Sequence, residues 1–143
     1  MDKKSNLMEL AEQVRAAAYA PYSGYRVGAA LLCTDGTVYT GSNIENAAFT
    51  PTICAERVAF FKAVNEGKFG FTALAVAGGK GSAVEDCVPC GVCRQVMQEF
   101  CDPDTFLILV RQAGEVKSYL LRELLPMGFG RNHVKGEMGN AGI

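Results

Sequence analysis

Residues 71–77 read FTALAVA, an apolar run bounded by glycines that is typical of a strand buried inside a sheet. Pro89 then begins a helix that is predicted over residues 90–101, and a second apolar run, FLILV, follows at residues 106–110. Because buried strands and helices alternate along the chain, the sequence predicts the α/β class, with one mixed sheet covered by helices on both faces.

The remaining segments predict elements that fit the same sheet. A first amphipathic helix is expected to begin at Asn6, where Asn6 and Glu9 form a capping box, and to end before Pro21. The other predicted elements are a hairpin over residues 27–40 that turns at Asp35-Gly36, a helix over residues 53–66, an edge strand over residues 115–119 and a short helix over residues 121–125. We therefore expect a single domain that takes up residues 1–143.

Charge and hydropathy narrow the classes of partner. The chain has 14 Lys and Arg against 15 Asp and Glu, so no broad electrostatic field would hold a nucleic-acid backbone or an anionic membrane. No apolar run approaches the roughly 18 residues of a membrane span, and the first residues, MDKKSN, do not resemble a signal-peptide core. We expect a cytoplasmic protein with a small, weakly charged partner, and neither nucleic acid nor a membrane.

Three of the six cysteines form a pattern suited to a metal. Cys54 is followed two residues later by Glu56, and far downstream Cys90 and Cys93 follow Pro89 as a Cys-x-x-Cys pair. Zinc prefers four ligands, so three thiolates leave one position for a water, whose pKa zinc lowers from about 15.7 to roughly 7. The spacing predicts an open zinc site where two helices begin.

Two other interpretations of the cysteines remain beside this one. Residues 87–93 read C-x-x-C-x-x-C, the start of an iron–sulfur motif, but Met97 stands where that motif needs its fourth cysteine. Alternatively, Cys87 closes the zinc tetrahedron, which would make the site structural. Cys33 and Cys101 are expected to be small packing residues.

An open zinc site with a free carboxylate suits hydrolytic deamination. Replacing an exocyclic amine on an aromatic ring requires a nucleophile, a proton for a ring nitrogen and a proton for the departing ammonia. Glu56 is predicted to move these protons. Three thiolates outweigh the two charges of zinc, and both the helix N-termini and Arg57, which adjoins Cys54, can offset that excess. Arg57 as an ordinary surface residue is an equally good hypothesis.

These motifs resemble those of the small zinc-dependent cytidine deaminases, specifically the type whose metal is held by three cysteines. The resemblance covers most of the chain in order, at residues 19–23, 27–31, 43–48, 54–57, 89–95 and 123–126. It implies a three-layer α/β/α fold with a mixed five-stranded sheet and one Zn²⁺ per chain. It also implies hydrolysis of cytidine and 2′-deoxycytidine to uridine and 2′-deoxyuridine with release of ammonia, a reaction of pyrimidine salvage.

The resemblance carries roles to individual residues. It implies Cys54, Cys90 and Cys93 as zinc ligands, Glu56 as the catalytic residue, Asn43 and Glu45 on the ribose hydroxyls, Tyr25 against the base, and Ala55, Ala47 and Phe49 as further substrate contacts. A homotetramer is also implied, in which Ala47, Phe49 and Phe129 reach into a neighbouring pocket. Tyr25 stands where the family commonly has Phe, and Phe49 where Tyr is common.

Alternatives to a nucleoside deaminase stay open at this point. Without the resemblance, Asn43 and Glu45 would be read as turn residues. A structural zinc module, an editing deaminase that acts on nucleic acid and a deaminase of a cytosine-containing antibiotic share the zinc motifs, and residues 43–46 are the main argument against the last. His133, the only histidine, is expected to be exposed in the tail.

Overall fold

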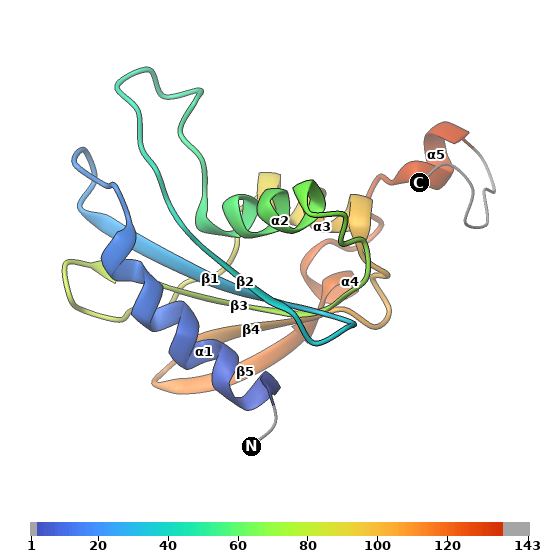
Figure 1. Cartoon of the computed structure of the whole chain (residues 1–143), viewed down its shortest axis with the longest axis horizontal. Coiled ribbons are helices and arrows are strands. Elements are labelled where there is room, and N and C mark those ends of the chain that lie inside the picture. The colour runs from blue at the N-terminus through green and yellow to red at the C-terminus, as the bar shows by residue number, and fades with distance from the viewer. Residues whose placement is uncertain (1–2, 136–143) are drawn as a thin grey trace.

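The computed structural model describes residues 3–135, and five strands of that region form one mixed sheet (Figure 1). The strands stand in the order β2-β1-β3-β4-β5. Their bounds are β1 Tyr25–Cys33, β2 Val38–Ser42, β3 Phe71–Lys80, β4 Leu107–Gln112 and β5 Glu115–Leu120. The central β3–β4 pair is parallel, and the other neighbouring strands are antiparallel.

Helices cover both faces of this sheet. Helix α1 (Lys3–Val14), with the 3₁₀ turn Arg15–Ala17 after it, lies on one face, whereas α2 (Ala55–Asn65) and α3 (Gly91–Phe100) lie on the other (Figure 1). Two short helices, α4 (Leu121–Leu124) and α5 (Arg131–Lys135), follow the last strand. No helix within residues 3–135 is long and apolar enough to cross a membrane.

Strand β1 contributes side chains to the hydrophobic clusters on both faces of the sheet. Ala29 and Leu31 belong to the cluster on the side of α2 and α3, whereas Ala30 and Leu32 belong to the cluster on the side of α1. This alternation is the two-residue period of a strand that is covered on both faces. The prediction of a three-layer α/β/α fold with a mixed five-stranded sheet is confirmed.

The central strand β3 is longer than its apolar run. Residues 73–79 are all buried, and the strand continues to Lys80. Gly79 pairs with Arg26 of β1, and only glycine fits there because a Cβ would lie 2.0 Å from the carbonyl oxygen of Ala83. Glycines add no apolar signal, so the prediction of residues 71–77 stopped short of the true end.

The predicted start of the first helix is wrong. Helix α1 begins at Lys3, so Asn6 lies within it instead of at its N-cap. Lys and Ser are tolerated in a helical turn, and no residue before Asn6 interrupts the helix. Its regular part ends at Val14, where the chain tightens into the 3₁₀ turn.

Close packing between β2 and α2 fixes where the second helix begins. A Cβ on Gly41 would lie 2.4 Å from the Ala55 carbonyl oxygen and 2.7 Å from the Ala59 nitrogen. Only glycine allows the first turn of the helix to approach the strand this closely. The start of α2 carries Cys54 and Glu56, so this contact also positions the site.

Candidate metal centre and substrate pocket

Three thiols meet where α2 and α3 begin. Cys54 is the N-cap residue of α2, Cys90 is the N-cap residue of α3, and Cys93 lies in the first turn of α3. The Sγ atoms of Cys54 and Cys90 are 3.6 Å apart, and those of Cys90 and Cys93 are 3.5 Å apart. All three sulfurs lie within 4.8 Å of one another.

This spacing fits zinc. A zinc–sulfur bond of about 2.3 Å in a tetrahedron places two sulfurs roughly 3.8 Å apart, close to the separations found here. Cys87 is not a member of this group of ligand atoms in the described part of the chain. The hypothesis that Cys87 closes the tetrahedron is therefore wrong, and three thiols form the group that could hold a zinc ion.

Cys87 lines the pocket beside the three thiols but is not part of their group. Its Sγ lies 2.7 Å from the place where a Cβ on Gly78 would be, and it forms a hydrogen bond with the side chain of Tyr25. Burial, with the neighbouring Cys87, raises the pKa of Tyr25 to about 12. Cys33 and Cys101 are buried in the hydrophobic core, as packing residues should be.

Glu56 occupies the first turn of α2 and is only 3% exposed. Burial raises the pKa of its carboxyl to about 7 in the metal-free protein, since the charged form loses its hydration. A carboxyl that titrates near neutrality can both accept and donate a proton at that pH. The structure brings it to the same pocket as Cys54 and Cys90.

Arg57 contacts the thiols directly. Its Nη2 donates a hydrogen bond to Cys54 Sγ at 3.5 Å, and the side chain is half-buried. The Cys93 thiol and Arg57 lower the pKa of Cys54 to about 5, against the opposing effect of burial. The neighbouring Cys54 thiol and burial raise the pKa of Cys93, while Arg57 opposes that rise. The hypothesis of an ordinary surface arginine does not fit these contacts.

A pocket of about 310 Å³ lies beside the three thiols. Its lining combines apolar side chains with the metal-binding and acidic groups: Tyr25, Val27, Asn43, Thr52, Ile53, Cys54, Glu56, Asp86, Cys87, Val88 and Cys90. Such a lining, largely apolar with a few convergent polar groups, is typical of a small-molecule site. Among these described lining residues there is no Lys or Arg.

Asn43 lines this pocket and also holds its wall together. The side chain is 8% exposed. Its Oδ1 accepts a hydrogen bond from the Val27 amide at 2.8 Å, and its Nδ2 donates to the Tyr25 carbonyl at 2.9 Å. Asn43 therefore fixes the start of β1, where Tyr25 enters the pocket.

Glu45 lies in a neighbouring hollow. Its carboxylate accepts hydrogen bonds from the amides of Tyr22 and Ser23 at 2.9 and 3.1 Å and from the Ser23 hydroxyl, which lowers its pKa. This hollow, of about 370 Å³, is lined by Tyr22, Ser23, Glu45, Asn46, Phe49 and Thr52. Thr52 lines both spaces, so the two adjoin.

The other predicted contacts do not line the metal pocket of this chain. Ala55 is fully buried against Gly41, and Ala47 is exposed in the loop before α2. Phe49 is 83% exposed and lines only the hollow around Glu45. Thr52 and Ile53, which the sequence analysis did not single out, do line the pocket; their adjacency to Cys54 was the available signal.

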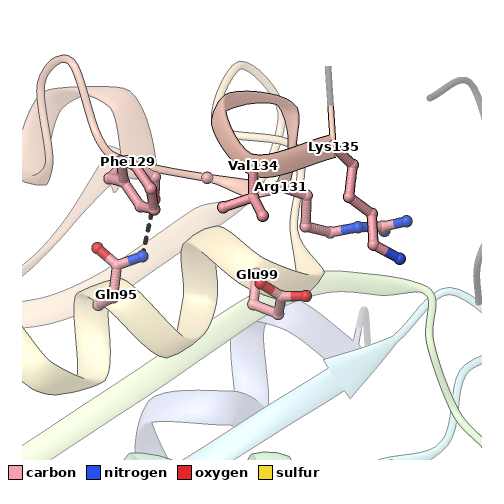
Figure 2. A pocket seen from close by; sticks show the side chains of 7 residues that line it. Gln95, Glu99, Phe129, Arg131, Val134 and Lys135 are labelled. Carbon is pink, nitrogen blue, oxygen red and sulfur yellow. Dashed lines mark hydrogen bonds between the residues drawn. The ribbon is translucent and has the colours of Figure 1, made fainter. Parts of the chain in front are cut away.

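The tail after the sheet forms a separate pocket of about 270 Å³ between α3 and α5 (Figure 2). Figure 2 shows the Gln95 amide pointing at Phe129, where its Nε2 donates to the Phe129 carbonyl at 2.7 Å. His133 stacks on the Phe129 ring and is exposed, as expected, and it is not part of the thiol group.

Comparisons with known proteins agree with this geometry. Residues 1–109 match the family model for the cytidine and deoxycytidylate deaminase zinc-binding region. The chain is 45% identical to a cytidine deaminase of Sporosarcina psychrophila over 92% of this chain and 93% of that protein. It is 46% identical to a cytidine deaminase of Halalkalibacterium halodurans over 90% of this chain and 95% of that one.

The fold agrees as well. A crystal structure of cytidine deaminase from Burkholderia pseudomallei superposes with a TM-score of 0.79 at 41% identity, covering 90% of this chain and all of that one. Sequence, fold and the three-thiol site thus point the same way, and the chain belongs to the cytidine and deoxycytidylate deaminase family with this zinc-binding region.

Proposed function

We propose that the chain hydrolyses the exocyclic amine of cytidine and 2′-deoxycytidine, which gives uridine or 2′-deoxyuridine and ammonia and serves pyrimidine salvage. The proposal is carried by one observation: a buried carboxyl, Glu56, shares a pocket with thiols that fit one zinc ion. The relatives of this chain that are named cytidine deaminases support the choice of substrate.

Cys54, Cys90 and Cys93 would hold the one Zn²⁺ of the chain. When bound, zinc supplies a water that ionises near neutral pH. Arg57 donates to Cys54 and so places a positive charge against the thiolates. The N-termini of α2 and α3, at which the ligands lie, add the positive ends of two helix dipoles.

Glu56 moves the protons of the reaction. Its carboxylate would accept one proton from the attacking water and deliver it to the ring nitrogen beside the attacked carbon. It would then take the proton of the hydroxyl formed on that carbon and pass it to the departing amine, which leaves as ammonia. Burial, which brings its pKa to about 7, suits a group that must act first as base and then as acid. Buried Ala55 and Ala59 on the same helix hold the first turn of α2 in place.

The metal pocket and the adjoining hollow around Glu45 would bind different parts of the substrate. We assign the base to the pocket of Tyr25 and Asn43, and the ribose hydroxyls to Asn43 and Glu45. Ala47, Phe49 and Ala55 remain predicted contacts. No Lys or Arg lines either space among the described residues, so a 5′-phosphate would find no cation there, which favours nucleosides over nucleotides.

We further propose that the protein is a single cytoplasmic deaminase domain, residues 1–143, that assembles as a homotetramer with shared pockets. Large apolar side chains are exposed on the described part of the chain: Phe49 is 83%, Met127 99% and Phe129 59% exposed. Exposed apolar surface of this kind is typical of a surface that a protein partner covers.

One assay tests the activity. Cytidine, 2′-deoxycytidine, cytosine, CMP and a cytosine-containing antibiotic are compared side by side, with zinc quantified per chain. We expect both nucleosides to be turned over with about one zinc per chain. Preferential turnover of CMP or of the antibiotic would contradict the nucleoside assignment, and full activity without zinc would contradict the metal assignment.

A further inference from the structure

Arg15 is a buried arginine whose partners are all backbone carbonyls. It lies in the 3₁₀ turn after α1 and is 6% exposed. Its Nε donates to the Arg26 carbonyl at 2.9 Å. Its Nη2 lies 3.0, 3.0 and 2.6 Å from the carbonyl oxygens of Gly79, Gly81 and Ala83.

This use of a buried cation is unusual because its charge has no carboxylate partner. None of the ion pairs among residues 3–135 includes Arg15. Burying a charge is costly unless hydrogen bonds compensate for the lost water, and here only carbonyl dipoles do so. Lysine could not replace this arrangement, since its single ammonium lacks the planar fork of donors that reaches two segments at once.

The segment that Arg15 holds is a tight turn at the end of β3. The chain leaves the sheet after Lys80 and returns at Glu85, whose amide donates to the Gly78 carbonyl at 2.8 Å. Glu85 Oε2 accepts from the Lys80 amide at 2.7 Å, which ties the two ends together. Gly81 has a positive φ of 57°, a conformation that glycine adopts readily and that suits a tight turn.

The chain runs from this turn directly into the site. Asp86, Cys87 and Val88 line the metal pocket, and Cys90, a proposed zinc ligand, follows two residues later. A shift of the turn would move the wall and the ligand together.

We propose that Arg15 is a positioning residue for the metal centre: its hydrogen bonds to the carbonyls of residues 79–83 hold the segment that carries the pocket wall and Cys90. The proposal rests on the proposed function only for the identity of the metal and substrate. It adds a residue from the end of α1 that is not part of any zinc motif and touches neither metal nor substrate.

Three variants test this role. Arg15→Met removes every donor, and Arg15→Lys keeps the charge without the fork. Arg26→Met is the matched control, because Arg26 is a neighbouring arginine whose side chain donates to the Ala16 and Ala18 carbonyls and not to the turn. For each zinc-loaded variant, the readouts are zinc loss to a chelator, amide exchange of residues 79–90, and kcat and KM for cytidine.

We expect Arg15→Met to lose zinc, and to exchange the amides of residues 79–90, at least roughly tenfold faster than Arg26→Met. KM should rise more than kcat falls, because the proton-moving group on α2 stays in place. Arg15→Lys should lie between the two. If Arg15→Met lowers only the melting temperature and matches Arg26→Met in zinc loss and in exchange, the proposal is wrong.

Two safeguards keep the result decisive. If Arg15→Met fails to fold, Arg15→Lys carries the comparison, and zinc loss equal to that of Arg26→Met overturns the proposal. Zinc loss and amide exchange need no substrate. A chain that turns over no cytidine would therefore contradict the proposed function and still leave these two measurements to decide on Arg15.

Discussion

Glu56 and Cys54 are two residues apart at the start of α2, yet their surroundings shift their pKa values in opposite directions. Burial raises the pKa of the carboxyl to about 7, while the Cys93 thiol and Arg57 lower the pKa of Cys54 to about 5. At neutral pH the metal-free site thus offers one thiolate for a metal and one carboxyl ready to exchange a proton.

Replacing Glu56 with glutamine should separate chemistry from metal binding. Glu56→Gln keeps the shape of the side chain but cannot accept a proton, so we expect turnover to fall by about 10²–10⁴-fold with zinc content unchanged. Cytidine turnover and zinc per chain are measured on the same sample. Glu9→Gln, on the exposed face of α1, is the control, and near-native turnover of Glu56→Gln would remove Glu56 from its role.

Removing the metal should expose a reactive thiol at Cys54. Because its pKa is lowered to about 5, Cys54 is a thiolate throughout pH 6–8, and its alkylation rate should change little across that window. Cys101, whose burial raises its pKa, should stay unmodified in the folded chain. Peptide mapping after brief alkylation measures both. Zinc should protect Cys54, and equal labelling with and without zinc would contradict its role as a ligand.

At the scale of elements, close packing between backbone segments places the site. Gly41→Ala would bring a Cβ against backbone atoms of Ala55 and Ala59, which cannot move without shifting α2. We expect the free energy of unfolding to fall by about 1–3 kcal/mol, and zinc loss to accelerate because Cys54 moves with the helix. Denaturant titration and chelator competition measure the two effects.

A second glycine gives the control for that prediction. A Cβ on Gly70 would meet the hydroxyl of Thr34, in a turn where no metal ligand lies. Gly70→Ala should therefore lower stability without accelerating zinc loss. If both variants lose zinc at the same rate, the loss follows from general destabilisation and the special role of the β2–α2 contact is refuted.

The sequence predicted elements well where a run of apolar residues is buried. It predicted them poorly where the end of an element, or the partner of a side chain, depends on residues far away in the sequence. The apolar run of β3 marks a strand covered on both faces, and the thiol spacing follows from two helix starts. By contrast, the last buried positions of β3 are glycines, which carry no apolar signal. Glu45 accepts hydrogen bonds from Tyr22 and Ser23, which lie far from it in the sequence and come close only in the folded chain. Residue spacing alone therefore could not show which hollow Glu45 lines.

At the scale of the whole molecule, the exposed side chains of Phe49 and Phe129 lead to a test of the proposed homotetramer. A pocket shared between subunits makes a specific prediction for mixtures. Phe49→Ala should raise KM for cytidine, since the ring would no longer close the pocket of a neighbour, and Glu56→Gln should be inactive. Each variant alone keeps one defect in every pocket.

Mixed oligomers would combine an intact Glu56 from one subunit with an intact Phe49 from another. After the two variants are unfolded and refolded together, the mixture should turn over cytidine with a lower KM than Phe49→Ala alone. Mass measurement in solution should give about four chains per particle. Phe49 contributing only within its own chain predicts that mixing leaves the KM of Phe49→Ala unchanged. A fully active monomer would refute both the tetramer and the shared pocket.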